Sequence, residues 1–277
     1  MSRLKRFVNG LPAQALMIAL SFMTLLPLYF MVSNSLKKRS QYVRDALSLP
    51  KPFTAENFIE AFGGKNFVQW FANSVTLTAT SMVVTTFIAI LAAYAFAKMK
   101  FKSRNFLFRM LIPLMAVPPI AMIIPQFSTI RLFGLVNTRA SVILIYTGIM
   151  LPMTIYLFRN FMITLPDSLL EAAIIDGCSR LRILFKIVIP LSTPAIITSA
   201  VVSVVWVWNE LLIALVFLQK EELRTLIVGI TLFKSRFTLN VPVIMAGLTI
   251  VTIPMIFVYV FAQRYLVEGL LAGSVKE

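Results

Sequence analysis

The sequence contains no histidine, one cysteine and few charged residues. Without histidine, the chain has no imidazole to act as a general base, a proton shuttle or a metal ligand. The single cysteine, Cys178, cannot form an internal disulfide or a thiolate zinc site. Charged residues make up only 13% of the chain, about half the share found in an ordinary soluble domain. These absences exclude histidine-dependent catalysis and a disulfide-stapled scaffold.

Apolar residues are abundant instead. They account for 59% of the 277 residues, and the mean hydropathy is +0.87. A soluble domain of this length could not bury so much apolar surface, so neither a soluble enzyme nor a disordered chain fits the composition. The surroundings of this chain must themselves be apolar.

Six stretches without Asp, Glu, Lys or Arg are long enough to hold a membrane-spanning helix, which needs about 20 mostly apolar residues. Their apolar parts predict helices near 13–33, 73–97, 107–128, 139–160, 194–218 and 241–263. The sequence therefore predicts an all-α polytopic membrane protein with six transmembrane helices. We expect residues 1–277 to form a single membrane domain.

Basic residues indicate the orientation of these helices. The N-terminus carries Arg3, Lys5 and Arg6, and the short segment 98–109 carries five basic and no acidic residues. Because cytoplasmic loops are enriched in Lys and Arg, we expect both termini in the cytoplasm. Segment 165–190 is then a cytoplasmic loop, and segment 34–70 an extracytoplasmic one. The net charge of +15 has the same origin, so no nucleic-acid partner is predicted.

Segment 165–190 follows the local rules for two short helices joined by a turn. Pro166 suits a helix start, and Ser168 and Glu171 have the spacing of a capping box. Gly177 suits the left-handed residue that ends a helix, and Ser179 can cap the next helix. Apolar residues at helical spacing lie between them: Leu169, Leu170, Ala173 and Ile174. By these rules the segment is either a plain connection between two spans or a docking element for a cytoplasmic partner.

The same segment resembles the EAA loop of ABC-importer permeases. It reads Glu171-Ala172-Ala173, then Asp176-Gly177, then Ile189-Pro190, with Ile189 where the family usually has Leu. The resemblance implies that this loop is a coupling helix that lies in a cleft of a partner ATPase. The residues that it assigns to ATPase coupling are Glu171, Ala172, Ala173, Asp176, Gly177 and Pro190.

Other segments are similar to the second permease of maltose and oligosaccharide importers. They are Asn57-Phe58, residues 71–74, residues 93–97 and the tail 263–276, which in such permeases reaches toward the ATPase. The resemblance implies a protein of the bacterial cytoplasmic (inner) membrane. Its implied partners are a second homologous permease subunit, two ATP-binding-cassette ATPase subunits, an extracytoplasmic solute-binding protein and membrane lipid.

No phosphate-binding loop of the form G-x-x-x-x-G-K-[ST] occurs in the sequence. The chain therefore cannot be the ATPase, and ATP and Mg would be bound by the partner ATPase. We expect no cofactor, no metal site and no catalytic residue in this chain, which would make it a non-catalytic subunit of an ATP-hydrolysing transport complex.

Polar residues and prolines inside the apolar stretches suggest a translocation pathway. Trp206, Asn209 and Glu210 fall within the predicted helix 194–218. An ionisable group in a bilayer costs roughly 3 kcal/mol, so Glu210 is expected to face a cavity or a partner. The three residues are candidates for the pathway or the subunit interface, with a structural hydrogen bond as the alternative. Four prolines predict a kink near the third helix: Pro113, Pro118, Pro119 and Pro125.

The resemblance implies a sugar or an oligosaccharide as the transported solute. The outer loop carries four basic residues, Lys37, Lys38, Arg39 and Arg44. They favour an anionic solute such as glycerol phosphate or an acidic sugar as the alternative. Solvated surface charge or docking of the binding protein explains these residues equally well. An ion-coupled carrier would need buried ionisable residues on several helices. Only Glu210 lies deep in an apolar run, so this class is less favoured.

Overall fold

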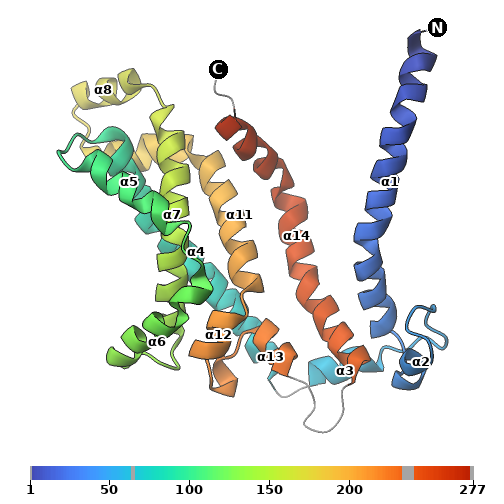
Figure 1. Ribbon diagram of the computed structural model, residues 1–277. Helices are drawn as coiled ribbons and strands as arrows, with labels where there is room; N and C mark the ends of the chain where they lie inside the picture. The colour runs from blue at the N-terminus through green and yellow to red at the C-terminus, as the bar shows by residue number, and fades with distance from the viewer. Residues whose placement is uncertain (1, 64–65, 233–239, 275–277) are drawn as a thin grey trace. The chain divides into compact units, whose positions relative to one another are not determined.

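In the computed structural model, every regular element among the described residues is helical (Figure 1). The structure describes residues 2–63, 66–232 and 240–274, and the side chains of residues 14–63, 66–232 and 240–263. The predicted all-α fold is confirmed.

Five helices are long, and shorter ones connect them. The long helices are α1 (Ser2–Ser35), α4 (Phe67–Lys98), α7 (Arg139–Ile163), α11 (Thr193–Asn209) and α14 (Val241–Ser274). The shorter elements are α2 (Arg39–Arg44), α3 (Glu56–Gly63), α5 (Arg104–Leu114), η1 (Pro119–Met122), α6 (Ile123–Leu132), α8 (Asp167–Ile175), α9 (Arg180–Ile183), η2 (Leu184–Val188), α10 (Ile189–Leu191), α12 (Leu212–Phe217), η3 (Glu221–Leu223) and α13 (Leu226–Leu232).

Four of the described helices are long and apolar enough to cross a membrane. They are Gln14–Ser35, Phe67–Lys98, Arg139–Ile163 and Val241–Gln263. Two further candidates are pairs of shorter helices, each bent sharply at a short break. The predicted number of six spans therefore depends on counting each bent pair as one span, and it stays a prediction.

The first bend confirms the kink that the prolines predict. α5 and the stretch Pro119–Leu132 meet at 99°. Pro119 begins η1, where its missing N–H costs nothing, whereas a straight helix through Pro118 and Pro119 would lose two hydrogen bonds. The second bend, of 74°, separates Arg180–Leu191 from α11, just before Pro194.

The described chain divides into two compact units. One unit contains Met1–Phe67 and Ile230–Ile253, and the other contains Val68–Gly229 and Pro254–Glu277. The single domain predicted over residues 1–277 stays a prediction.

In the first unit, the segment after α1 forms an ordered cap of short helices and turns. Lys37 is fully buried, and its ammonium donates hydrogen bonds to the carbonyl oxygens of Ala46 (2.8 Å) and Asp45 (3.3 Å). Asn57 donates to the carbonyl oxygens of Ser35 and Lys37, both at 2.8 Å. Burial lowers the pKa of Lys37, and the nearby Asp45 carboxylate partly opposes this. Lys37 therefore holds the cap together and is not part of an exposed basic surface for an anionic solute.

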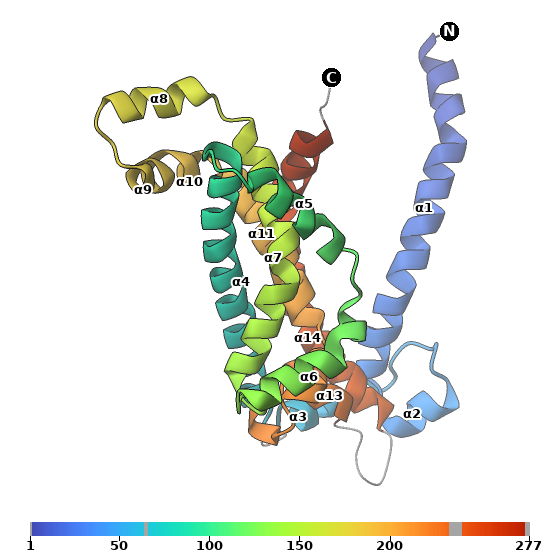
Figure 2. The ribbon, with the colours of Figure 1, turned by 60° about the vertical axis from the view of Figure 1, so that its left-hand side comes forward.

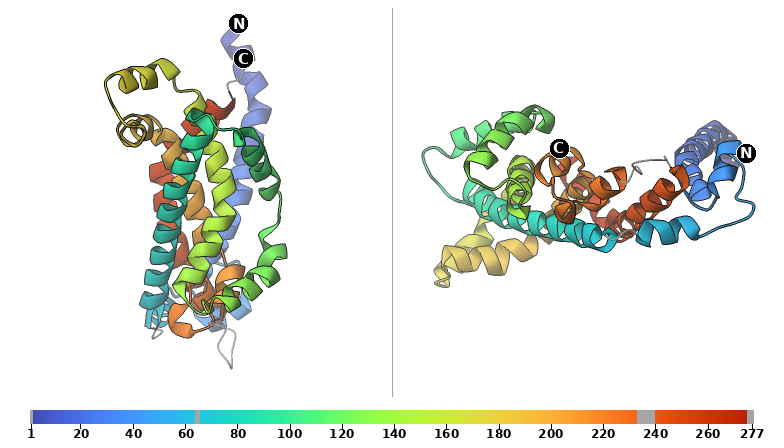
Figure 3. Two further views of the ribbon diagram at one scale, coloured as in Figure 1. Left: turned by 90° about the vertical axis from the view of Figure 1, so that its left-hand side faces the viewer. Right: turned by 90° about the horizontal axis from the view of Figure 1, so that it is seen from below.

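In the second unit, α4, α7 and α11 surround the apolar core (Figure 3). One cluster of buried residues joins α4, α7, α8, η2 and α11, and includes Tyr94, Phe158 and Leu184. A second cluster joins α4, α7, α11 and α12, and includes Tyr146 and Phe217. The loop with α8 to α10 lies at one end of this unit, and α6 and α12 lie at the other end (Figure 1).

Candidate functional site

The turn after α8 is a Schellman motif. The N–H of Gly177 donates to the carbonyl of Ile174, and the N–H of Cys178 donates to the carbonyl of Ala173, both at 3.0 Å. Gly177 has φ of +78°, a left-handed conformation that costs any other L-residue free energy. The predicted helix stop is confirmed. Asp176, at the C-cap, donates its own N–H to the carbonyl of Ala172.

The start of α8 differs from the prediction. The helix begins at Asp167 with Pro166 as its N-cap, and no side chain caps it. Ser168 is thus already inside the helix, so the capping box with Glu171 does not form. Ser179 behaves as predicted, because its Oγ accepts a hydrogen bond from the N–H of Arg182 at 3.3 Å and begins α9.

α8 has one face packed on its own unit and one face exposed. Leu170 and Ala173 are buried in the core cluster that also contains Tyr94 and Leu184. Leu169, Glu171, Ala172, Ile174, Ile175 and Asp176 are exposed, Ile175 to 84%. The predicted apolar stripe is therefore only half right: two of its four members pack inward and two, Leu169 and Ile174, do not.

A buried cation fastens the start of α8 to the end of α4. Lys98 Nζ donates to the carbonyl oxygen of Leu165 (2.6 Å) and forms an ion pair with Asp167 Oδ1 (2.7 Å). The hydrogen bond and charge of Lys98 lower the pKa of Asp167. A depressed carboxyl pKa means that this contact persists throughout the neutral range and is lost only as the pH falls through that low value.

The end of the loop leads into α11 through an irregular helix. α9 continues into η2, a π-helical turn over Leu184–Val188, and then into α10, where Pro190 is exposed. Such turns are rare and are often found at functional sites. Figure 2 shows α8 and α9 extending away from α4 and α7, with α10 beside the end of α4. The structure thus brings Glu171, Ala172, Asp176 and Gly177 together on α8 and its cap.

Glu210 does not lie inside a continuous helix, contrary to the prediction for 194–218. α11 ends at Asn209, Glu210 has extended backbone, and α12 begins at Leu212. The Glu210 carboxylate accepts hydrogen bonds from the N–H groups of Ile213 (2.8 Å) and Ala214 (3.0 Å) and from the hydroxyl of Tyr146 (2.7 Å). Because its carboxylate serves as the acceptor at the start of α12, the helix restarts there. The alternative of a structural hydrogen bond to a neighbouring helix is thus present in the structure.

The other pathway candidates point in different directions. Trp206 packs edge-on against Tyr146, with ring centroids 5.4 Å apart, whereas Trp208 packs edge-on against Phe71 at 5.9 Å. Asn209 is exposed, and its side chain donates to the carbonyl of Val205 in its own helix. The structure therefore brings Trp206 and Glu210 together around Tyr146, and leaves Asn209 outside this group.

A polar network lies at the end of the second unit opposite α8, and the sequence analysis did not predict it. Asn73 Nδ2 donates to the carbonyl oxygens of Glu222 (2.8 Å) and Arg224 (3.0 Å), and its Oδ1 accepts from Arg139 Nη2 (2.7 Å). Nearby, Asn137 Oδ1 accepts from the N–H of Gln219 (2.7 Å). These bonds fasten the segment after α12 to the starts of α4 and α7. No local signal marks them, since their partners are far apart in the sequence.

We predict that Asn73→Asp weakens this network more than Asn73→Ala. The aspartate keeps an acceptor for Arg139 but places a carboxylate oxygen against the two carbonyl oxygens of Glu222 and Arg224. Loss of the two amide bonds costs about 1 kcal/mol each, and the added repulsion increases this. Hydrogen exchange of residues 219–226 should accelerate in the order wild type, Asn73→Ala, Asn73→Asp. Equal exchange in all three proteins would contradict the assignment.

An apolar cavity lies at the inside of the first bend. It has a volume of about 670 Å³ and is lined by α5, η1, α6 and α7, with Pro119 and Pro125 among its walls. Gln126 and Thr129 are polar members of its lining, and the Gln126 Oε1 is buried without a hydrogen-bond partner in the described structure. The cavity shows that the bend opens space between packed helices.

The described side chains hold no cluster of three or more His, Cys, Asp or Glu that could bind a metal ion. The expectation that this chain carries no metal and no cofactor stays a prediction. The side chains of the tail 264–276 lie outside those that the structure describes.

A family model matches most of the chain. The family described as "Binding-protein-dependent transport system inner membrane component" matches residues 85–271, which include α7, the loop with α8 to α10, and α11.

Individual relatives match nearly the whole length. The chain is 34% identical over 260 residues to the probable starch degradation products transport system permease protein AmyC of Thermoanaerobacterium thermosulfurigenes, covering 94% of each chain. It is 32% identical over 252 residues to the melibiose/raffinose/stachyose import permease protein MelC of Bacillus subtilis (strain 168), covering 91% of each. Among solved structures, a chain of a bacterial ABC transporter involved in the import of the acidic polysaccharide alginate superposes with a TM-score of 0.84 at 25% identity, covering 93% of this chain and 96% of that one.

Proposed function

Because this chain belongs to the family of binding-protein-dependent transport system inner membrane components, we propose that it carries a sugar across the membrane and is driven by a separate ATPase through α8. Permease subunits of sugar ABC importers are its relatives, which supports the coarser assignment of a sugar-importer permease. The coupling role of α8 and the identity of the solute are proposed in addition to this assignment.

The exposed face of α8 is the observation that carries the coupling role. Ile174 and Ile175 are exposed to 57% and 84%, beside Ala172 and Glu171. A short helix held at the end of a membrane unit with two exposed isoleucines has unburied apolar surface for a partner groove. Glu171 and Asp176 add charge beside this surface.

The buried face of α8 couples movement of this helix to α4, α7 and α11. Leu170 and Ala173 pack into the cluster that contains residues of α4, α7 and α11. Lys98 fastens the start of α8 to the end of α4, and the Schellman motif fixes where α8 ends. When the ATPase closes on ATP, a displacement of α8 would therefore move the packed helices between two states, as switching through packed interfaces requires. In this scheme Ala173 and Gly177 act by holding α8, and Pro190 by shaping the return into α11.

The complex would contain a second homologous permease subunit, two ATPase subunits and an extracytoplasmic solute-binding protein. ATP and Mg would be bound by the ATPase subunits, and this chain would contribute no cofactor, metal or catalytic residue. Both termini and α8 would lie in the cytoplasm, as the basic segment 98–109 indicates.

The solute is proposed to be an oligosaccharide, because AmyC and MelC are named for starch products and for melibiose, raffinose and stachyose. An acidic sugar is the second candidate, favoured by the likeness to the alginate importer. Stimulation of ATP hydrolysis by the binding protein loaded with neutral or with uronate oligosaccharides distinguishes the two. An ion-coupled carrier is disfavoured, since the Glu210 carboxylate is occupied by three protein hydrogen bonds.

We predict that Gly177→Ala and Glu171→Ala each reduce the amount of ATPase that co-purifies with this chain in mild detergent. A left-handed alanine costs roughly 1–2 kcal/mol, which loosens the end of α8, while Glu171→Ala removes an exposed charge from its docking face. We expect a several-fold loss of the ATPase in pull-downs, with the second permease retained.

Gly134→Ala is the matched control for this experiment. Gly134 has φ of +67°, and an added Cβ there would meet nothing within 4 Å, as at Gly177, but Gly134 lies in the loop between α6 and α7. It imposes the same backbone strain away from α8. If Gly134→Ala loses the ATPase as severely as Gly177→Ala, or if neither α8 variant loses it, the coupling role is wrong. A wild-type chain that purifies alone and transports solute would overturn the importer assignment itself.

A further inference from the structure

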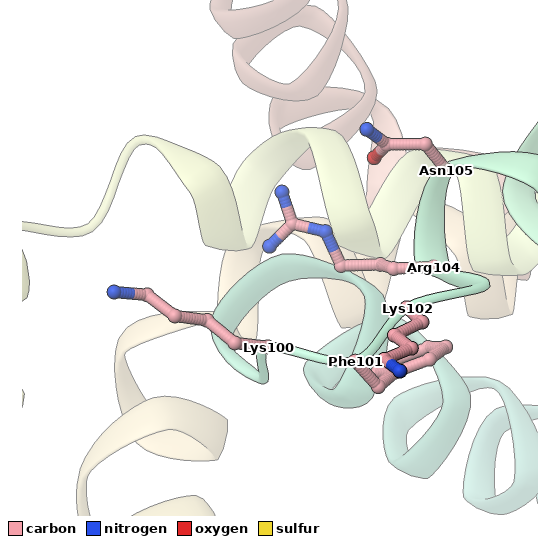
Figure 4. Close-up of a pocket in the computed structure, with 5 residues that line it drawn as sticks. All are labelled: Lys100, Phe101, Lys102, Arg104 and Asn105. Atoms are coloured by element: carbon pink, nitrogen blue, oxygen red, sulfur yellow. The ribbon is translucent and has the colours of Figure 1, made fainter.

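A basic pocket lies in the connection between α4 and α5. It has a volume of about 330 Å³, within the size range of small-ligand sites, and is lined by Lys100, Phe101, Lys102, Arg104 and Asn105. Figure 4 shows the side chains of Lys100 and Arg104 extending to the same side of the connection. Lys102 also lines the pocket, and no acidic residue does.

None of these cations forms a close ion pair with a carboxylate among the described residues, although the Asp167 carboxylate lies near enough to Lys100 for their charges to attract. The ion pair found there joins Lys98 to Asp167, outside the pocket. Arg104 donates one hydrogen bond, from Nη1 to the carbonyl oxygen of Met99 at 3.3 Å, which leaves most of its guanidinium donors available. Lys100 and Lys102 are exposed. Three basic side chains face one nearby carboxylate, so the pocket keeps net positive charge and several free donors, the features that bind phosphate.

The helix that continues from the pocket has an exposed apolar surface. Phe106, Met110 and Leu114 of α5 are exposed to 65%, 55% and 55%. Neither a free anion nor an acidic protein surface would bury the apolar residues that lie beside these charges. An amphiphile with an anionic head and apolar tails matches both parts, because it places its head among the cations and its tails along α5.

We propose that the basic pocket, formed by Lys100, Phe101, Lys102, Arg104 and Asn105, binds the phosphate headgroup of an anionic phospholipid whose acyl chains lie along the exposed face of α5. Lys100 lies near Asp167, the first residue of α8, and lipid binding at this site goes beyond the proposed transport function. Its assignment to the cytoplasmic leaflet rests on the proposed orientation. The pocket begins two residues after Lys98, so a bound lipid would also steady the segment that fastens α8.

The test uses the full importer complex in mild detergent, titrated with phosphatidylglycerol or phosphatidylcholine, with retained lipids counted by native mass spectrometry. Wild type should retain phosphatidylglycerol in preference to phosphatidylcholine. The variant Lys100→Gln/Lys102→Gln/Arg104→Gln should bind it about a hundredfold more weakly, since each Lys or Arg near an anionic surface contributes about fivefold. Size-exclusion chromatography verifies that the variant complex is intact.

The control variant Lys38→Gln/Arg39→Gln/Arg44→Gln removes the same charge from exposed positions of the outer loop. Its phosphatidylglycerol retention should stay within twofold of wild type. Equal retention by the pocket variant, or equal binding of phosphatidylcholine, would overturn the proposal. Displacement of the lipid by millimolar inorganic phosphate would instead identify a free-anion site. Loss of the ATPase with lipid retention unchanged would show that the cations contact the ATPase, and would also refute lipid binding without touching the transport assignment.

Discussion

Gly229→Ala is expected to destabilise the second unit strongly. A Cβ at this position would overlap the six-membered ring of Trp70. The indole cannot easily move away, because Trp70 is only 6% exposed and its Nε1 donates a hydrogen bond to the carbonyl oxygen of Glu221 at 2.9 Å. Forcing an extra methyl group into packed surroundings costs about 1–3 kcal/mol, and the overlap with a fixed ring places this variant at the upper end. We expect the apparent Tm of the purified protein to fall by several degrees.

A second substitution makes this expectation specific. Trp70→Leu removes the ring that causes the overlap, so the double variant Gly229→Ala/Trp70→Leu should lose less stability than the sum of its two single variants. Gly148→Ala is the neutral control, because a Cβ at Gly148 would meet nothing within 4 Å. Strict additivity in the double variant, or an equal loss for Gly148→Ala, would mean that the close contact between Gly229 and Trp70 does not limit the packing.

Glu210→Ala is expected to have the second large effect. The substitution leaves three donors without their acceptor: the N–H groups of Ile213 and Ala214 and the hydroxyl of Tyr146. Tyr146, Ile213 and Ala214 are all buried, so water cannot readily replace the carboxylate. Each unsatisfied buried donor costs about 1–3 kcal/mol, for a loss of about 3 kcal/mol or more. Thermal unfolding in detergent should show this loss, and Tyr146→Phe should show a smaller one because it removes a single hydrogen bond.

The neighbouring residue supplies the control for Glu210. Asn209 is exposed and bonds only within its own helix, to the carbonyl of Val205, so Asn209→Ala should change stability little. Measuring both transport and stability distinguishes a structural role of Glu210 from a role in the translocation pathway. A structural role predicts that transport per folded complex is retained in Glu210→Gln. If Glu210→Gln folds normally but loses transport, the carboxylate acts in the pathway instead.

Local patterns in the sequence were sufficient for much of the fold. The apolar runs predicted the helical class, because backbone groups in lipid must be satisfied within a helix. The four prolines at 113, 118, 119 and 125 predicted a kink near the third helix, since each removes a donor, and the bend between α5 and α6 lies just before Pro119. Gly177 and Ser179 predicted the end of α8 and the start of α9, because a left-handed turn and a side-chain cap depend on residues within a few positions of each other.

Contacts between distant residues were beyond these patterns. The run after Glu210 is as apolar as the run before it, so periodicity alone continued the helix. The break depends on a carboxylate whose third partner, Tyr146, lies 64 positions earlier. The Asn73 network depends on partners 149 and 151 positions away, and the burial of Ala173 depends on which helices meet beneath α8.

The sequence by itself therefore determined the helical membrane class, the bend at the prolines and the turn that ends α8. Only the tertiary structure decided which face of α8 is free for a partner, that Lys37 is buried rather than exposed, and that Glu210 begins a new helix. The physical reason is the range of the interactions. Helix starts, stops and kinks arise from hydrogen bonds between near neighbours in the chain, whereas burial and the pairing of polar groups arise from residues that only folding brings together.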